Sequence, residues 1–265
     1  MPLAVIPWFE LPSLSLGPIT IQSFGVLSAL GILAAVELAS RGDRQLGNDP
    51  RVIPDFAVAG VITGVVFGHL AHLFFYHPEE LADPWRIAKF WEGLSSMGGL
   101  LGGIVAAVVF FRVRKIPFRR HADAFALGVA PGWGVARVGC FTVHDHPGVH
   151  TSFPLAVRFA DGPRHDLGLY EAIVLFSIGG LLWAFHRRDV LRGRLLPLLA
   201  LLYGVARFLL DFLRASDVPY ADARHAGLTF AQYFSVGLVA WSVWAFARYR
   251  PPGAGEARFA AKAAR

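Results

Sequence analysis

Residues 195–214 read LLPLLALLYGVARFLLDFLR, and this stretch decides the kind of fold that the chain adopts. A segment of about 20 mostly apolar residues has the length that a helix needs to cross the hydrocarbon core of a bilayer. Lipid offers no water to hydrogen-bond the backbone, so such a segment has to satisfy its own amide and carbonyl groups. The stretch therefore predicts a transmembrane helix.

Similar apolar runs recur along the chain. They lie near residues 22–40, 54–76, 97–111, 123–142, 170–186, 195–213 and 229–247. Of the 265 residues, 55% are hydrophobic and only 17% are charged, with a mean hydropathy of +0.49, unlike a soluble globular domain. We expect an all-α integral membrane protein with about seven transmembrane helices, built as a single polytopic domain over residues 1–250.

The basic residues predict how these spans are oriented. The net charge is +6, and most of the 25 Lys and Arg residues lie in alternate gaps between the runs and after the last one. Positively charged loops stay on the cytoplasmic side of a membrane. The N-terminus is therefore expected outside and the C-terminus inside, with residues 251–265 as a basic cytoplasmic tail. Topology accounts for the positive charge, so no nucleic-acid partner is expected.

The longest external segment runs from about residue 141 to 169. Its prolines, histidines and aspartates predict a loop region with short elements, large enough to shape a site. The chain has one cysteine, Cys140, which excludes an internal disulfide and a cysteine-built metal site. His69 and His72 are three residues apart and are interpreted as polar packing residues, since no third ligand accompanies them. No metal site is predicted.

Ionisable side chains inside the sixth run form the strongest functional signal. Tyr203, Arg207, Asp211 and Arg214 are spaced four, four and three residues apart, which puts them on one stripe of a helix. Arg137 ends the fourth run at the same outer depth. Charged residues in a span are costly and usually face protein or water. Since a guanidinium group matches a pair of phosphate oxygens, the cluster suggests a phospholipid ligand.

Two simpler interpretations of these arginines stay open. Arg207 and Asp211 are four residues apart and can neutralise each other on a helix surface. Arg214 can extend its long side chain to the phosphates of surrounding lipids.

Six segments of the chain carry a further signal. In order they are LGPITIQSFG (16–25), GLSSMGGLLGGIVA (93–106), VARVGCFTVHDHPG (135–148), RHDLGLYEA (164–172), YGVARFLLDFLRASD (203–217) and GLTFAQYFSVGL (227–238). Their order within the seven-span, N-out topology resembles the bacterial prolipoprotein diacylglyceryl transferases. The resemblance covers almost the whole chain, although no single segment is decisive.

This resemblance implies an activity and its partners. The diacylglyceryl group of phosphatidylglycerol would be transferred to the lipobox cysteine thiol at the signal peptide of a lipoprotein precursor, forming a thioether and releasing glycerol phosphate. The location implied is the bacterial cytoplasmic (inner) membrane. No metal or dissociable cofactor is implied, and the chain is expected to act as a monomer.

The resemblance also assigns residues to the site. Arg137 matches the arginine of the family's R-x-G-N-F motif, while Asp211 replaces the usual glutamate of the sixth-span motif. The catalytic candidates are Arg137, Arg207, Tyr203 and Asp211. The substrate-binding candidates are Arg214, Gly98, Gly99, Gly148, Asp145 and His165. For the glycines, close helix packing is the simpler interpretation, because Gly98 and Gly99 recur as small residues four positions later.

Several motif positions depart from the family pattern. Met97 replaces a histidine, Cys140 an asparagine, Phe24 a tyrosine and Gly168 a glutamine, and Asp145 corresponds to a later glutamate. These departures motivate a second hypothesis, a transferase-like paralogue that binds phospholipid without this chemistry or transfers a different group. A third hypothesis, an unrelated transporter, would predict internal repeats, and none is convincing.

The sequence does not select a base for the acceptor thiol. Catalysis of such a transfer needs help with thiol deprotonation and with charge on the departing phosphate. Arg137 and Arg207 suit the second task. The external segment offers His144, Asp145, His146 or His165 for the first task.

Overall fold

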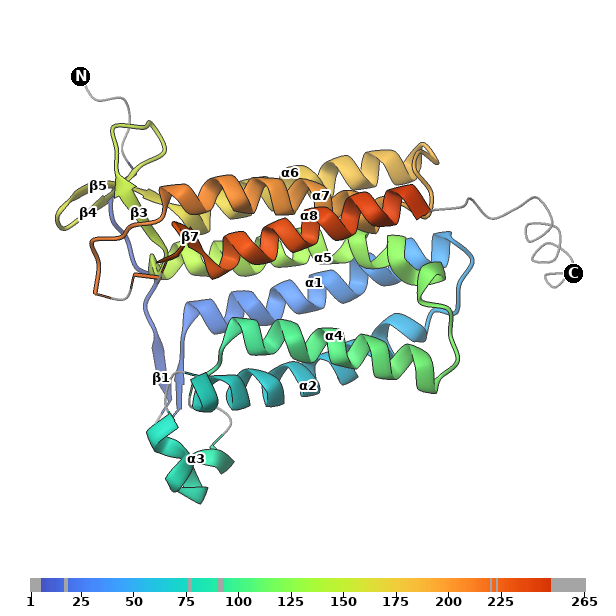
Figure 1. Cartoon of the computed structure of the whole chain (residues 1–265), viewed down its shortest axis with the longest axis horizontal. Helices are drawn as coiled ribbons and strands as arrows, with labels where there is room; N and C mark the ends of the chain where they lie inside the picture. Colours follow the sequence, from blue (N-terminus) through green and yellow to red (C-terminus); the bar gives the residue numbers. More distant parts are fainter. Residues whose placement is uncertain are drawn as a thin grey trace, which may run out of the picture. The chain divides into compact units, whose positions relative to one another are not determined.

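The computed structural model describes residues 6–248, apart from 17–18, 76–77, 90–92, 220 and 223. In this part of the chain, the long helices are α1 (Ser23–Gln45), α2 (Val52–Phe75), α4 (Ser96–Val113), α5 (Phe118–Val143), α6 (Leu167–Arg187), α7 (Leu195–Leu210) and α8 (Phe230–Arg248) (Figure 1). Each of them coincides with one predicted apolar run. The predicted tail, 251–265, lies outside the described residues.

Six helices in the described residues are long and apolar enough to cross a membrane. They are α1, α2, α5, α6, α7 together with the 3-10 turn η2 (Asp211–Leu213), and α8. Helix α4 is a shorter apolar helix over Gly98–Val113. The expected all-α membrane protein is thus confirmed at this level, while seven crossings and the orientation of the termini stay predictions.

The remaining elements are short. Between α2 and α4 lie the 3-10 helix η1 (Pro78–Ala82) and helix α3 (Pro84–Ala88). The strands are β1 (Leu14–Leu16), β2 (Ile19–Ile21), β3 (Pro147–His150), β4 (Val157–Phe159), β5 (Gly162–Asp166), β6 (Arg224–His225) and β7 (Leu228–Thr229). They form an antiparallel pair β1-β2, a three-stranded sheet in the order β3-β5-β4, and an antiparallel pair β6-β7.

The chain divides into two compact units. The first comprises residues 1–42 and 122–265, and the second comprises residues 43–121. In the second unit α2 and α4 pack against each other, and Gly98 permits the close approach because a Cβ there would overlap the carbonyl oxygen of Phe67. A buried contact of 2.8 Å joins His121 Nδ1 to Asp43 Oδ2, so the two ends of this unit are held together.

Helix α5 lies at the centre of the first unit. Gly128 and Gly132 are small enough to let α1 approach, since a Cβ at Gly128 would overlap the carbonyl oxygen of Ala35. On another side of α5, Leu127 packs in a buried cluster with residues of α6 and α7. Buried Asp123 accepts hydrogen bonds from the backbone amides of Gly193 and Leu195, which satisfies donors at the start of α7.

The segment between α5 and α6 folds as the small three-stranded sheet. Pro147 pairs with Asp166 and Val157 pairs with Arg164 across β5. Figure 1 shows this sheet at the end of the first unit where α5 finishes and α6 begins. The predicted loop over 141–169 corresponds to this sheet, with α5 and α6 each reaching a few residues into it, and its position outside the membrane stays a prediction.

The sixth predicted run does not continue as one α-helix. Helix α7 ends at Leu210, the chain tightens into η2, and the backbone of Arg214 is extended with ψ 136°. The prediction of a single helical stripe is therefore wrong for Arg214. The physical reason is a competing partner, because the extended backbone at Arg214 forms a β-bridge with Gly148.

Candidate functional site

Glu171 is the centre of a buried charge cluster in the first unit. It lies one turn into α6, and its side chain is 1% exposed. Its Oε2 lies 2.8 Å from Nε of Arg137 on α5, and its Oε1 accepts a hydrogen bond from Nη1 of Arg207 on α7. The Tyr203 hydroxyl donates to Oε2 at 3.3 Å. One carboxylate thus brings three helices together.

Asp211 is the second carboxylate of the cluster and is fully buried. Its Oδ1 lies 3.2 Å from Nη2 of Arg207 and 3.3 Å from Nε of Arg214. Its Oδ2 accepts a hydrogen bond from the Thr229 hydroxyl. Thr229 and Gln232 exchange hydrogen bonds at the start of α8, in the manner of a capping box, so this helix is tied to the same cluster.

We call Arg137, Arg207 and Arg214, with Glu171 and Asp211, the arginine cluster. It holds three guanidinium groups against two buried carboxylates. The outermost, Arg214, also pairs at 2.8 Å with Asp222, whose side chain is half exposed. Buried charges persist only when they are paired. The predicted neutralisation of Arg207 by Asp211 therefore occurs, but in the protein interior and with Glu171 sharing the charge.

Arg137 combines its ion pair with Glu171 with two weaker contacts. Its Nε is buried and, although it lies beside Glu171, it has no aligned hydrogen-bond acceptor among the described residues. Its Nη1 lies 3.4 Å from Cys140 Sγ and 3.3 Å from His146 Nε2. The Nη1 donor, whose contacts are a thiol and an imidazole, is suited to an incoming anion, because phosphate oxygens are far stronger acceptors.

Cys140, Asp145 and His146 meet beside Arg137. The ligand atoms of these three side chains lie within 4.8 Å of one another, and His146 Nδ1 contacts Asp145 Oδ1. Such a trio has the donor types of a metal site. Here, however, Nη1 of Arg137 contacts both Cys140 and His146, so the cation among these groups is the protein's own guanidinium.

Two glycines set the distances between the elements around the cluster. A Cβ on Gly148 would lie 2.6 Å from the Leu213 carbonyl oxygen, so only glycine lets β3 approach the chain that carries Arg214. A Cβ on Gly168 would lie 2.8 Å from the backbone nitrogen of Phe141. Gly168, which departs from the family pattern, thus lets α6 start against the end of α5.

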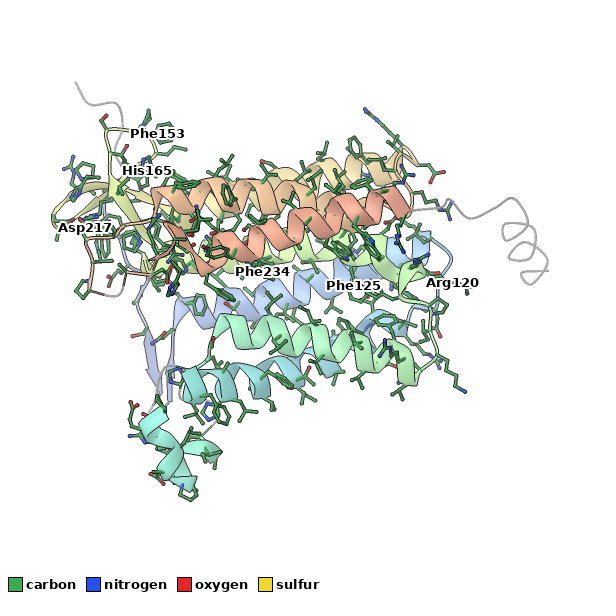
Figure 2. The ribbon with its side chains drawn as sticks, viewed as in Figure 1. Arg120, Phe125, Phe153, His165, Asp217 and Phe234 are labelled. Carbon is green, nitrogen blue, oxygen red and sulfur yellow. The ribbon has the colours of Figure 1, made fainter. Side chains whose placement is uncertain are left out.

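The three-stranded sheet is anchored to the segment after η2 by a second, separate charge network. The buried Arg164 guanidinium donates to Asp217 at 2.7 and 3.0 Å, to Asp161 and to the Gly148 carbonyl. These hydrogen bonds lower the pKa of Asp217 to about 2 and lower that of Asp161. Figure 2 labels Asp217 and His165 at this end of the unit.

The predicted site residues do not all meet. Five of them join the cluster directly through hydrogen bonds or ion pairs: Arg137, Tyr203, Arg207, Asp211 and Arg214. Asp145 reaches it through His146, and Gly148 through the Arg214 backbone.

His165 takes a different position. Its Nδ1 lies 2.9 Å from the Tyr170 hydroxyl, its ring packs on Phe153, and burial lowers its pKa. No contact with the arginine cluster is found for His165 within the described residues. Gly98 and Gly99 belong to the second unit, where Gly98 is a packing residue. A substrate-binding role for these three residues stays a prediction.

Four contributors were not among the predicted site residues: Glu171, Thr229, Gln232 and the contact of His146 with Arg137. Glu171 carried a usable signal, since a carboxylate inside an apolar span merits a functional hypothesis by itself. Thr229 and Gln232 occupy the spacing of a capping box at the start of the last span. The contact of His146 carried no sequence signal, because it depends on how the chain turns after α5.

Comparisons with known proteins show which proteins the chain is similar to. A model of the family described as prolipoprotein diacylglyceryl transferase matches residues 12–248. A phosphatidylglycerol–prolipoprotein diacylglyceryl transferase of Chromohalobacter salexigens is 33% identical over 245 residues, covering 88% of this chain and 91% of the relative. Proteins of the same description are 32% identical in Nitratidesulfovibrio vulgaris strain DP4, covering 90% and 94%, and in Pseudomonas aeruginosa strain LESB58, covering 91% and 96%.

Proposed function

The chain belongs to the prolipoprotein diacylglyceryl transferase family, and from this membership we propose that it transfers a diacylglyceryl group from phosphatidylglycerol to the lipobox cysteine of lipoprotein precursors. The observation that carries the assignment to residues is the arginine cluster, in which Glu171 and Asp211 hold three guanidinium groups together. The transporter hypothesis is excluded by the family membership.

The proposed reaction is a displacement at a glycerol carbon. The acceptor thiol loses its proton, its sulfur forms a bond to the carbon, and the carbon–oxygen bond to the phosphate breaks with the electron pair leaving on oxygen. Negative charge grows on the departing glycerol phosphate. Preorganised donors that face such a charge are worth more in a dry site than in water.

Arg137 and Arg207 are the residues proposed to bind and stabilise that phosphate. Both arginine side chains are mostly buried and form ion pairs with Glu171. Their guanidinium groups therefore need little reorganisation when negative charge develops on the phosphate. Arg214 is proposed as the outer headgroup contact, because it also reaches Asp222 near the surface. Tyr203 and Asp211 act by fixing the arginines, since they contact Glu171, Arg207 and Arg214.

The proposed topology places this chemistry at the outer face of a bacterial cytoplasmic membrane. The end of α5, the start of α6, the end of α7 and the start of α8 meet at the cluster, which fits alternating crossings with an external N-terminus. The basic loops then lie inside. Phosphatidylglycerol headgroups and the signal peptides of exported precursors both meet at that face, and a single chain supplies the whole cluster.

The alternative is a paralogue that binds phospholipid without this transfer. It is favoured by Met97 and Cys140, which stand where the family pattern has histidine and asparagine. The sulfur atoms of methionine and of a cysteine thiol are weak acceptors, so neither Met97 nor Cys140 is suited to act as the base. A working enzyme therefore needs a base from elsewhere in the chain.

Complementation distinguishes the two. The chain is expressed in bacteria depleted of their own transferase, with growth and lipid modification of a precursor as readouts. Wild type is expected to restore both, and Arg207→Ala to reduce modification at least 100-fold, in the range of losses on removing a charge-stabilising donor. Arg158→Ala, at an exposed arginine of β4, is the control and should behave as wild type. Failure of the wild-type chain to modify the precursor would favour the paralogue.

A further inference from the structure

The proposed transfer requires a base for the acceptor thiol. A cysteine thiol has an ordinary pKa near 8.5, so only a small fraction is thiolate at neutral pH. Histidine is the side chain best suited to remove such a proton under these conditions. The external segment offers His144, His146, His150 and His165, and their surroundings differ.

Three of these histidines are committed elsewhere. His144 is buried among Trp8, Phe9 and Phe141, with Nδ1 on Asp166 at 2.6 Å, so its ring is a packing element. His165 is paired with Tyr170. His150 lies on the exposed part of the sheet, beside Asp161 and Asp217.

His146 is the histidine at the arginine cluster, and its neighbours fix which ring nitrogen carries the hydrogen. Arg137 has no lone pair and always donates, so the His146 Nε2 at 3.3 Å from Arg137 Nη1 has to be an acceptor. Nδ1 then carries the hydrogen and donates a hydrogen bond to the Asp145 carboxylate, and this bond orients the ring. The lone pair of Nε2 therefore faces the side chain proposed to bind the headgroup phosphate.

We propose that His146, oriented by Asp145, is the general base that deprotonates the acceptor thiol. The proposal rests on the proposed function. A phosphate oxygen is a stronger acceptor for Arg137 than the imidazole is, so headgroup binding draws the guanidinium away and frees Nε2. The base thus becomes available when the lipid is in place.

The step balances without any further reactant. Nε2 takes the thiol proton, the sulfur displaces the phosphate oxygen at the glycerol carbon, and the imidazolium that results is stabilised by Asp145. The proton then passes to the released glycerol phosphate or to water. His146 is 22% exposed at its side chain, so it touches both the cluster and the surface from which a peptide approaches.

Cys140 does not take the place of the acceptor. Its Sγ lies 3.4 Å from Arg137 Nη1, yet attack by this sulfur on the glycerol carbon would leave a thioether on the protein. A thioether sulfur is a very poor leaving group, so the diacylglyceryl group could not move on. Cys140 is therefore a buried neighbour of the base and not an intermediate carrier.

A selenocysteine peptide tests the proposal. The purified full chain is assayed in phosphatidylglycerol vesicles with two synthetic lipobox peptides, one with cysteine and one with selenocysteine. A selenol is already ionised at neutral pH and needs no base. His146→Gln is expected to reduce kcat/KM for the thiol peptide about 100-fold, in the range typical of a lost general base, and to leave the selenol peptide within about threefold of wild type.

The controls separate the possible failures. His150→Gln, at an exposed histidine four residues further along the chain, should leave the rates with both peptides unaffected. Equal losses with thiol and selenol in His146→Gln would assign His146 a structural role and overturn the proposal, as would wild-type rates with the thiol. The reaction with the selenol peptide reports whether the rest of the site is intact. A misfolded variant would lose activity with both peptides and would also show a lowered melting temperature. A wild-type protein inactive with both peptides would instead refute the proposed function, and the base with it.

Discussion

At the scale of single residues, Glu171 explains more of the site than any arginine does. An arginine in an apolar span is stabilised only when a counter-charge lies next to it, and Glu171 serves Arg137 and Arg207 at the same time. Each arginine alone could have been an isolated surface charge. The shared carboxylate makes them one preorganised group.

Replacement of this carboxylate tests that statement. Glu171→Gln keeps the size of the side chain but removes the charge, which leaves two buried guanidinium groups poorly paired. Loss of one partner of a buried ion pair lowers the free energy of unfolding by about 3 kcal/mol. We expect a clear fall of the melting temperature in detergent and loss of precursor modification. Glu37→Gln, at a half-exposed ion pair with Arg41, is the control and should change neither.

At the scale of elements, the site depends on how α5 and α6 meet. The end of α5 and the first turn of α6 are in contact at Gly168, where the family pattern has a larger residue. Arg137 and Glu171 lie on these two helices. The distance between the helices therefore sets the distance between the charges.

A methyl group at this junction is expected to separate the two helices. Gly168→Ala places a Cβ against the backbone of Phe141 and Cys140, which cannot move easily, and overpacking of this kind costs about 1–3 kcal/mol. Both thermal stability and transfer should fall. Gly180→Ala on the same helix meets nothing within 4 Å and should be neutral or slightly stabilising, so equal effects of the two changes would contradict the explanation.

The stability of the three-stranded sheet is expected to depend on pH. The pKa of Asp217 is lowered by Arg164 from 3.8 to about 2, so its contribution to stability is present above about pH 4 and is lost as the pH falls toward 2. We expect limited proteolysis of the segment 147–166 to accelerate over that range. Asp217→Asn should be more susceptible at pH 6 and show less change on acidification, whereas Asp189→Asn, at an exposed residue after α6, should follow wild type.

At the scale of the whole molecule, the orientation of the chain in the membrane is the prediction that still has to be tested. Charge asymmetry between the loops predicts that 151–156 is outside and 188–193 inside. In intact cells a membrane-impermeant maleimide should therefore label the variant Thr151→Cys and not the variant Arg188→Cys. Both should react after the membrane is permeabilised. Labelling in the reverse order would place the arginine cluster at the cytoplasmic face and remove it from exported precursors.

The places of the apolar helices follow from the amino-acid sequence alone, because a bilayer imposes length and hydropathy on each span locally. Leu195–Leu210 and its neighbours could be identified without knowledge of their partners. The same local reasoning found Arg137, Arg207 and Arg214, since charged residues stand out in an apolar run.

Only the tertiary structure decided which of these groups meet. Glu171 was not predicted as a site residue, because its role depends on two arginines that are 34 and 36 residues away in sequence. Arg214 leaves the helical stripe because β3 offers its backbone a partner, and His146 was selected from four histidines by its contact with Arg137. Spacing along a chain fixes the face of one helix, but the pairing of buried charges depends on distances between helices, which packing alone sets.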